Sequence, residues 1–184
     1  MNLSNYDNKV DIDFIDLFIM PAKAEDFEFY FQMKCEKENI YWSGYKSAPD
    51  KEKLHTWFMQ KVAQYKDKYS YKLYIILART NRIYTKVGYL SLYPSCNCKD
   101  CCEISIGVSS SHTGKGIGTK AIKLAIDESA KIGYKKIFAY IRKDNIRSQA
   151  AFTKAGFILT EQSRKVFFKN INCDVEMWEY VYDL

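Results

Sequence analysis

The stretch from Glu103 to Gly118, EISIGVSSSHTGKGIG, decides the fold, because a strand, a glycine-rich turn and the start of a helix follow one another in it. Apolar residues at positions 104, 106 and 108 alternate with polar or small ones, which is typical of a strand with one buried face. Apolar residues at helical spacing from 117 to 125 then indicate a helix that ends at Gly133. Backbone N–H groups and the positive end of the helix dipole therefore meet at the turn, an arrangement that attracts a phosphate.

The turn contains three glycines, Gly114, Gly116 and Gly118, which leave a ligand free to approach the backbone, while Lys115 adds a positive charge. The turn is too short for the phosphate loop of magnesium-dependent nucleotide-binding proteins, and it lacks their Lys-Ser/Thr pair. Glycines spaced by two residues after antiparallel strands also do not fit the dinucleotide-binding fingerprint. Taken alone, the glycines are equally compatible with a tight turn that binds nothing, so a second motif has to decide.

Outward from this stretch, the chain reads as an α+β protein. Runs of β-branched and aromatic residues predict strands, and apolar residues at helical spacing predict helices. The predicted strands cover residues 14–20, 71–79, 86–93, 102–109, 136–142, 157–168 and 173–182, and the predicted helices cover 25–38, 50–65, 114–133 and 145–155. We therefore expect a mixed, mostly antiparallel twisted sheet of about six to seven strands, flanked by about four helices.

The composition indicates one domain over residues 1–184, in which residues 1–12 form a polar N-terminal arm. The net charge of +6 is dispersed along the chain among acidic residues rather than concentrated in a block, so it could equally serve an anionic small ligand as nucleic acid. No stretch approaches the roughly 18 apolar residues of a membrane span, and no signal pattern opens the chain. We expect a cytoplasmic protein that binds neither nucleic acid nor membranes; a homodimer is left open.

The second motif runs from Asn145 to Phe157 and reads NIRSQAAFTKAGF. Together with the glycine turn, it resembles the GNAT superfamily of acetyl-CoA-dependent N-acetyltransferases. Members of that superfamily read V-x-x-x-x-R/Q-G-x-G-x-G/A and then, after the next strand, N-x-x-A/S-x-x-x-Y/F-x-x-x-G-F. The positions in register with the two patterns are Val108, the glycine turn, Asn145, Ser148, Phe152, Gly156 and Phe157.

The resemblance implies an acetyl-CoA-binding core over residues 103–157, in which the sheet splays between the strands ending near Val108 and Arg142. The pantetheine arm would fill the gap as a pseudo-strand on the backbone of Ile106 and Val108. Asn145 and Ser148 also suit the N-cap and first turn of a helix, and both roles are compatible. The implied acetyl-CoA-binding residues are Ile106, Val108, Thr113, Gly114, Lys115, Gly116, Ile117, Gly118, Thr119, Asn145, Ser148 and Phe152.

Two residues depart from the pattern of the superfamily. Thr113 stands where Arg or Gln is usual, so one contact to the pyrophosphate is missing, and Lys115 compensates for it in part. Phe152 stands where many members have a tyrosine that protonates the departing CoA thiolate. Since Phe152 has no proton to donate, the thiolate would need another acid, a water molecule or direct departure.

Acetyl transfer to an amine requires a proton acceptor, because a protonated amine has no lone pair with which to attack the thioester. By strand alternation, Glu103 points away from the apolar face formed by residues 104, 106 and 108. Members of the superfamily often carry a carboxylate near this position, so Glu103 is the candidate base, acting through water. The alternative is a solvated glutamate at a strand start; Tyr140, Glu179 and Tyr182 are weaker options.

The resemblance places the acceptor pocket at the first two helices, where aromatic residues are also expected as core. The candidate acceptor-binding residues are Tyr30, Tyr41, Trp42 and Tyr45. A polar, aromatic pocket suits a primary amine of a small molecule such as an amino sugar or aminoglycoside, attacked directly in a ternary complex. The alternatives are a protein N-terminal amine as acceptor and a non-catalytic CoA-sensing module, which Thr113 and Phe152 would suit.

Four cysteines lie within seven residues before the strand that carries Glu103, namely Cys96, Cys98, Cys101 and Cys102. Such a loop could wrap one zinc ion, which prefers four sulfur or nitrogen ligands. However, Cys101 and Cys102 would point to opposite faces if both are extended. The sequence therefore favours reduced thiols, and we expect no metal requirement.

Overall fold

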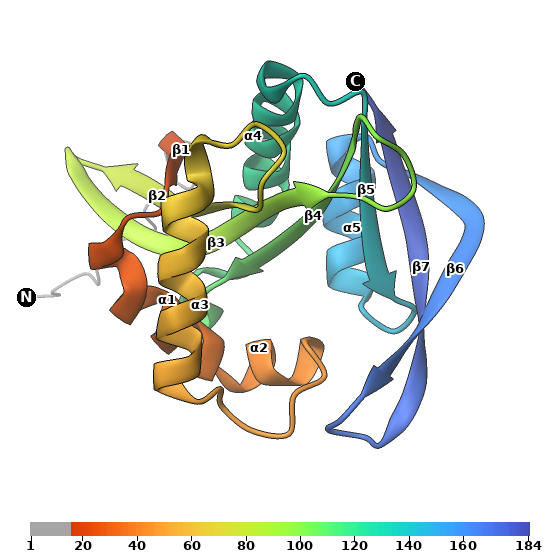
Figure 1. The fold of residues 1–184 in the computed structure, drawn as a ribbon, viewed down its shortest axis with the longest axis horizontal. Helices are drawn as coiled ribbons and strands as arrows, with labels where there is room; N and C mark the ends of the chain where they lie inside the picture. Colours follow the sequence, from red (N-terminus) through yellow and green to blue (C-terminus); the bar gives the residue numbers. More distant parts are fainter. Residues whose placement is uncertain (1–15) are drawn as a thin grey trace, which may run out of the picture.

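The computed structural model describes residues 16–184, which form one seven-stranded sheet with helices on both faces (Figure 1). The predicted N-terminal arm and the first two residues of the strand predicted over 14–20 lie outside the described residues. The strands are β1 (Asp16–Pro21), β2 (Lys72–Thr80), β3 (Ile83–Pro94), β4 (Cys101–Val108), β5 (Lys136–Arg142), β6 (Ile158–Phe168) and β7 (Cys173–Asp183). The α-helices are α1 (Phe27–Cys35), α2 (Lys37–Trp42), α3 (Lys51–Ala63), α4 (Ile117–Ile132) and α5 (Ile146–Ala155).

The strand order in the sheet is β1-β2-β3-β4-β5-β7-β6. Every neighbouring pair is antiparallel except β4 and β5, whose chain directions agree because α4 carries the chain back across the sheet between them. A two-residue turn with positive φ at Asn81 and Arg82 joins β2 to β3, which suits the twist of a hairpin. The predicted mixed, mostly antiparallel sheet is confirmed, and its strand number is the upper of the two expected.

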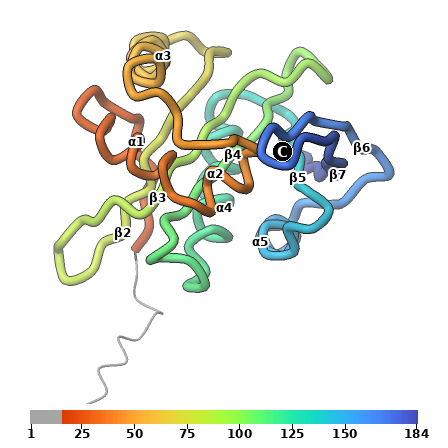
Figure 2. The backbone as a smooth tube through the Cα atoms, turned by 90° about the horizontal axis from the view of Figure 1, so that it is seen from below, coloured from red at the N-terminus to blue at the C-terminus, as the bar shows by residue number. Residues whose placement is uncertain are grey.

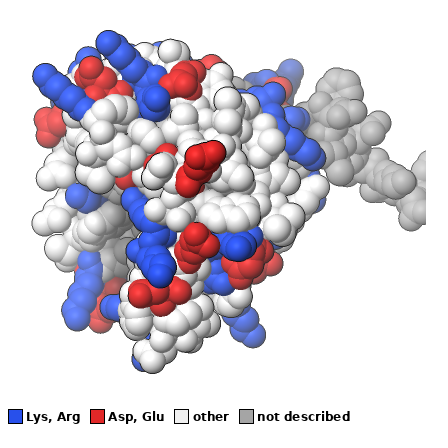
Figure 3. Space-filling view, turned by 90° about the vertical axis from the view of Figure 1, so that its right-hand side faces the viewer, with Lys and Arg blue, Asp and Glu red and all other residues white. Residues whose placement is uncertain are grey.

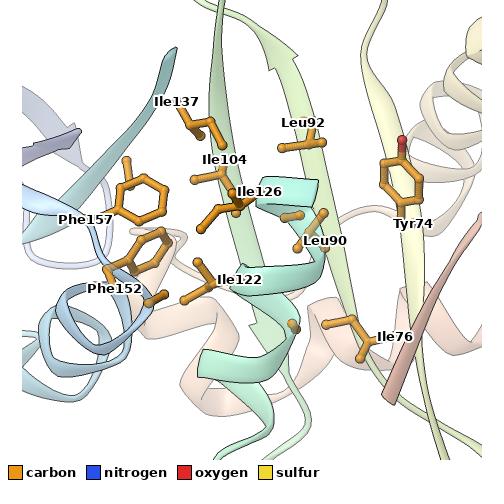
Figure 4. Close-up of a cluster of buried hydrophobic side chains, with 14 of the residues drawn as sticks. Tyr74, Ile76, Leu90, Leu92, Ile104, Ile122, Ile126, Ile137, Phe152 and Phe157 are labelled. Atoms are coloured by element: carbon orange, nitrogen blue, oxygen red, sulfur yellow. The ribbon is translucent and has the colours of Figure 1, made fainter. Parts of the chain in front are cut away.

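Two apolar cores lie on opposite faces of the sheet. α4 and α5 cover one face, and Figure 4 shows Ile122 and Ile126 of α4 packed beside Leu90, Ile104 and Ile137 of the sheet. α1 and α3 cover the other face through Tyr30, Met33 and Phe58, and Figure 2 shows the two helix layers on either side of the strands. The alternate residues of β4 and β5 therefore face different helices.

The N-terminal helical region differs from the prediction of one helix over residues 25–38. A 3₁₀ turn precedes α1, and the backbone becomes extended at Glu36, where φ is −61° and ψ is 135°, before α2 begins. No Pro or Gly marks the break. Glu36 instead accepts hydrogen bonds from the Ser109 hydroxyl (2.9 Å) and the Ser110 backbone N–H (3.0 Å), more than seventy residues away. A tertiary contact at the end of β4 thus accompanies a break that helix periodicity does not predict, and the described region contains five α-helices rather than four.

The break turns α2 away from α1 and toward the β6–β7 hairpin (Figure 1). The backbone N–H of Asn170, in the β6–β7 turn, donates to the Gly44 carbonyl just after α2 (3.2 Å). This contact holds α2 and the β6–β7 hairpin together at one end of the sheet, next to the region where β4 and β5 separate.

Between residues 16 and 184, no helix is both long and apolar enough to cross a membrane.

Candidate active site

The site is a groove that opens where β4 and β5 separate. Over the described residues, the two strands pair only at Cys101–Lys136, Cys102–Ile137 and Glu103–Phe138. Beyond these pairs, residues 104–108 of β4 and 139–142 of β5 form opposite walls of a cavity of about 610 Å³. Backbone groups on the facing edges of the two strands are left without sheet partners, so the groove can accept a ligand that offers amide groups.

The glycine turn lies at the end of the groove that is farther from the β4–β5 pairs. Gly114 and Gly116 adopt positive φ values of 78° and 72°, which disfavour any residue with a Cβ atom. A Cβ at either position, or at Gly118, would meet no protein atom within 4 Å, so these glycines border open space. α4 begins at Ile117, directly after the turn, and its first N–H groups lack intrahelical partners. The turn thus forms an uncovered backbone cradle suited to a phosphate.

The start of α5 forms another part of the groove wall. The Asn145 side chain accepts a hydrogen bond from the Ser148 backbone N–H (3.1 Å), so Asn145 is the N-cap of α5. Both residues also line the groove, and the two roles expected of them are compatible in the structure. Phe152 lines the groove too and packs edge-on against Phe157, with ring centroids 5.0 Å apart.

Most of the residues predicted to bind acetyl-CoA converge on this groove. Lys115 is the exception: its ammonium lies 3.4 Å from the Ser111 carbonyl, and it does not line the cavity. Thr113 does line the cavity, and its hydroxyl donates to the Ser110 carbonyl (3.0 Å). The predicted residues found on the groove wall are Ile106, Val108, Thr113, Gly114, Gly116, Ile117, Gly118, Thr119, Asn145, Ser148 and Phe152.

A polar cluster occupies the opposite end of the groove, near the last β4–β5 pair. The Tyr140 hydroxyl lines this end, donates to Glu179 on β7 (2.9 Å) and accepts from the Asn97 side chain (2.8 Å). Burial raises the pKa of the Tyr140 phenol, and the Glu179 carboxylate adds to that effect. Burial and the nearby Glu103 carboxylate raise the pKa of Tyr93, also on the wall, to about 12. Both phenols are therefore protonated at neutral pH.

Glu103 lies behind this wall rather than on it. Its side chain is buried and paired with Arg164 of β6 (3.1 Å), so the alternative of a solvated glutamate is wrong. The Arg164 guanidinium lines the groove and stacks on the Tyr140 ring at 3.5 Å from the ring centroid. Glu103 therefore meets the groove through Arg164 and Tyr93, whereas Tyr140 connects the groove to Glu179. Tyr182 lies on the opposite face of the sheet, against Phe157.

Of the four aromatic residues predicted to contact the acceptor, only Trp42 lines the groove. Tyr30 is a buried core residue between α1, α3 and β3, and Tyr45 is exposed. Tyr41 borders a separate shallow pocket beside the start of α5. The resemblance implies a pocket at the first two helices but does not show which aromatic side chains face it, and Tyr30 belongs to the core instead.

Arg142, the last residue of β5, is a groove residue that the sequence motifs do not indicate. It is 5% exposed, it lines the groove, and it pairs with Asp144 through Nη2 (2.6 Å) and Nε (2.9 Å). Hydrogen bonding to Asp144 raises the pKa of Arg142 and lowers that of Asp144. Three aromatic rings surround the guanidinium, from Tyr41, Trp42 and Phe168 at 4.8 to 5.0 Å. The only sequence signal was an arginine at the end of the run Ile137–Ile141, which is apolar and aromatic.

The cysteine cluster differs from the expectation of reduced thiols, because Cys98 and Cys101 form a disulfide. A turn in which the Cys101 N–H donates to the Cys98 carbonyl (3.3 Å) brings their Cα atoms to 5.3 Å, within the normal disulfide range. Cys102 points into the core beside Ser129, and Cys96 is exposed. Among residues 16–184, no three potential ligands lie close enough together to hold a metal ion.

Charged residues are interspersed on the surface. On the face shown in Figure 3, lysines and arginines alternate with aspartates and glutamates. Within the groove, the basic side chains are Arg142, Arg147, Lys154 and Arg164, and the acidic ones are Glu36 and Glu38. Three of these basic side chains are paired: Arg147 with Glu38 (2.7 Å), Arg142 with Asp144 and Arg164 with Glu103. The side chains of the groove are therefore close to neutral in sum, and the backbone N–H groups of the glycine turn are its main attraction for an anion.

A split sheet, an open glycine turn and a helix N-terminus form a groove suited to a phosphate-bearing ligand, and the family comparison gives the class of protein. The chain belongs to the GNAT acetyltransferases: a family model described as an acetyltransferase (GNAT) domain matches residues 16–158. The match includes both motifs on which the resemblance was based.

Solved structures share the fold over nearly the whole chain. A domain from Methanocaldococcus jannaschii superposes with a TM-score of 0.72 at 27% identity, covering 92% of this chain and 99% of that one. Spermidine N-acetyltransferase from Vibrio cholerae, in complex with CoA and spermine, has a TM-score of 0.75 at 15% identity and covers 89% and 94%. Aminoglycoside acetyltransferase AAC(6′)-Ib, in complex with coenzyme A, has a TM-score of 0.71 at 18% identity and covers 91% and 95%.

Among curated proteins, the chain is similar to mycothiol acetyltransferase of Corynebacterium glutamicum (strain R), with 32% identity over 56 residues. The matched segment is 30% of this chain and 19% of that protein, so the chain spans only about a fifth of that relative. This likeness is local.

Proposed function

We propose that the protein is an N-acetyltransferase that moves the acetyl group of acetyl-CoA to a primary amine of a small molecule. The observation that carries the proposal is the groove between β4 and β5, which ends at an open glycine cradle on the N-terminus of α4. Membership of the GNAT family and the CoA complexes of structurally similar proteins support this assignment.

The residues present fit acetyl-CoA. The turn at Gly114 and Gly116 offers backbone N–H groups to the pyrophosphate, at the positive end of the α4 dipole. Ile106 and Val108 have backbone groups that lack a β5 partner and can bind the amides of the pantetheine arm. Thr113 supplies a hydroxyl where related sequences have Arg or Gln, so the cradle relies on backbone groups.

The reaction joins the amine nitrogen to the thioester carbonyl carbon, breaks the C–S bond and releases the thiolate with its electron pair. The nitrogen must first lose a proton. Two carboxylates compete for this role: Glu103, behind Arg164, and Glu179, which Tyr140 links to the groove. The hydrogen bond from Tyr140 favours Glu179 as the final proton acceptor, with the phenol passing the proton on.

The departing thiolate receives no proton from Phe152, which is a buried hydrocarbon ring on the wall. A thiol is a far better leaving group than an amine, so the thiolate can depart directly and take a proton from water. The direct reaction needs no covalent enzyme intermediate.

Several classes of acceptor amine are compatible with this proposal. Aminoglycosides and polyamines are suggested by the substrates named for structurally similar proteins, and an amino sugar would suit a wall that contains Trp42. The second candidate is a CoA-binding module without turnover, which the absence of a proton donor at Phe152 would suit. A protein N-terminal amine is the third.

Calorimetric titration with acetyl-CoA tests the common part of these proposals, and lack of binding at millimolar ligand would overturn all of them. A thiol-release assay with amino sugars, aminoglycosides, polyamines and short peptides then separates them. An enzyme liberates CoA only when its amine is present, whereas a sensing module binds acetyl-CoA and releases no thiol with any amine.

A further inference from the structure

The loop between β3 and β4, residues 95–100, reaches the polar cluster at the Tyr140 end of the groove. The Asn97 side chain donates to the Tyr140 hydroxyl (2.8 Å) and, at 3.5 Å, to Oε2 of Glu179. Tyr140 lines the groove, whereas Asn97 does not. Asn97 therefore contacts both members of the hydrogen-bonded pair that leads away from the groove, without being part of the groove wall.

The partners of the Asn97 amide determine which of its atoms faces them. An asparagine amide has an acceptor oxygen and a donor nitrogen, and its hydrogen-bond partners distinguish the two. An ionised carboxylate only accepts, so the part of the amide near Glu179 has to be the NH₂ group. Tyr140 donates its one hydrogen to Glu179 (2.9 Å) and can therefore only accept from Asn97. Both contacts require the same orientation of the amide.

These contacts leave the Tyr140 hydroxyl with one direction for its hydrogen and one open acceptor position. A phenol oxygen donates one hydrogen and can accept at two positions. The hydrogen is directed to Glu179, and Asn97 occupies one of the acceptor positions. Among the described residues, no further hydrogen-bond partner contacts this oxygen, so its second acceptor position is available to an amine.

A purely structural role would make the Asn97 side chain a support of its own loop, but other groups already hold this loop. The Ser95 backbone N–H donates to the Cys101 carbonyl (3.0 Å), and the Ser95 hydroxyl accepts from the Asn97 backbone N–H (3.2 Å). The Cys98–Cys101 disulfide closes the same loop. Within the loop, the Asn97 side chain has only a 3.7 Å contact with the Cys96 thiol. The loop therefore holds the amide in place, as a catalytic group's supporting contact is held.

We propose that Asn97 is a positioning residue that acts through Tyr140, by directing the phenol hydrogen to Glu179 and stabilising negative charge on the phenol oxygen. This inference rests on the proposed function and adds a residue to its proton route. The amine proton moves to the open position of the Tyr140 oxygen as the phenol hydrogen moves to Glu179, and the amide keeps both of its hydrogens. Burial raises the pKa of Tyr140, and the hydrogen bond from Asn97 opposes that rise.

The ionisation of Tyr140 can be measured without turnover. 3-Fluorotyrosine, whose phenol titrates at lower pH than that of tyrosine, is placed at position 140 alone, and its fluorine resonance is followed against pH. Asn97→Ala should raise the pKa of this probe by about 0.5 to 1 pH unit, because a donor to the phenolate is lost. Asn97→Asp should raise it further, since a carboxylate repels the phenolate. The matched control is Lys99→Ala, at an exposed residue of the same loop, which should leave the pKa unchanged. An unchanged pKa in both Asn97 variants contradicts the inference.

A double-mutant cycle tests whether Asn97 acts through Tyr140 during turnover. Asn97→Ala should lower kcat/KM for the acceptor about tenfold, as the loss of one hydrogen bond would. Acetyl-CoA affinity should stay within about twofold by calorimetry, because Asn97 is not on the groove wall. In the Tyr140→Phe background, Asn97→Ala should change kcat/KM by less than about twofold, since the group on which it acts is absent. A tenfold loss in both backgrounds, or no loss in either, shows that Asn97 does not act through the phenol.

The two measurements keep this inference distinct from the proposed function. If no amine is turned over, the proposed function fails, while the fluorine titration still decides whether Asn97 controls the ionisation of Tyr140. A raised pKa in Asn97→Ala then supports the contact, and an unchanged one contradicts it. If amines are turned over but the effects of Asn97→Ala and Tyr140→Phe multiply independently, the protein is an acetyltransferase in which Asn97 has no positioning role.

Discussion

The Tyr140 hydroxyl lies 2.9 Å from Oε2 of Glu179 and joins the wall of the groove to a buried carboxylate on the adjacent strand. Tyr140 and Glu179 are directly opposed in the β5–β7 register, so strand pairing itself sets this contact. Thr160 also donates to Glu179 (3.0 Å), which fixes the second carboxylate oxygen. A proton entering at the phenol therefore has a defined destination.

Replacing Glu179 by Gln should lower kcat/KM by about 10²- to 10⁴-fold, the usual contribution of a positioned base. The rate of the variant should also keep rising with pH toward the pKa of the acceptor amine, because only amine already deprotonated in solution would react. Tyr140→Phe should show the same pH profile. In contrast, Glu103→Gln should leave that profile unchanged, and a profile altered only by Glu103→Gln would assign the base to Glu103.

The glycine cradle predicts a separation of stability from ligand binding. Gly116 and Gly133 begin and end α4 with positive φ values of 72° and 94°. A glutamate at either position should cost about 1–2 kcal/mol of unfolding free energy in urea. Only Gly116→Glu should also weaken acetyl-CoA binding, by about 100-fold or more, because its carboxylate enters the phosphate cradle. Calorimetry showing equal affinities for the two variants would place the pyrophosphate elsewhere.

A second matched pair concerns helix caps. Asn145 caps α5, and Asp50 caps α3 through a 2.8 Å hydrogen bond from the Lys53 backbone N–H. Alanine at either cap should lower the free energy of unfolding by about 0.5–2 kcal/mol. Asn145→Ala should weaken acetyl-CoA binding as well, by about tenfold, because Asn145 lines the groove and Asp50 does not. If Asn145→Ala binds acetyl-CoA as tightly as the unaltered protein, then Asn145 serves only as the N-cap of α5.

The Cys98–Cys101 disulfide predicts sensitivity to reduction. It closes a very short loop, for which chain entropy gives about 1–2 kcal/mol of stabilisation. Dithiothreitol should therefore lower Tm by about 2–8 °C in the unaltered protein. It should have no such effect in Cys98→Ser, and its full effect should persist in Cys173→Ser, which removes an exposed free thiol. Equal Tm values with and without reductant would show that the pair contributes nothing to stability.

Features that depend on local sequence periodicity could be predicted well. The strand expected over residues 136–142 matches β5, because its run of apolar residues sits between Gly133 and the asparagine that caps α5. The helix ending at Gly133 and the strands predicted over 157–168 and 173–182 also agree with the structure. The groove wall formed by the glycine turn and the start of α5 could be predicted, because its glycines and the capping asparagine occur at a fixed spacing in the sequence.

The end of the groove beside α2 could not be predicted, because it is assembled from contacts between distant segments. Glu36 ends α1 where it meets residues of the β4 end, and Arg142 acquires its cage from α2 and β6. The neighbouring sequence of Glu36 and Arg142 contains no pattern that predicts these contacts. Tyr30 shows the converse, since an aromatic residue at helical spacing became part of the core rather than the pocket.

The separation of β4 from β5 has a consequence for the dynamics of the sheet. Three residue pairs join its two halves directly, and the remaining connection on that side is the apolar core beneath α4 and α5. Amide protons on the inner edges of the two strands should exchange quickly with solvent deuterium in the free protein. A ligand that pairs with those edges acts as the missing strand, so slower exchange at Ile106 and Val108 would measure how far the bound molecule has become part of the sheet.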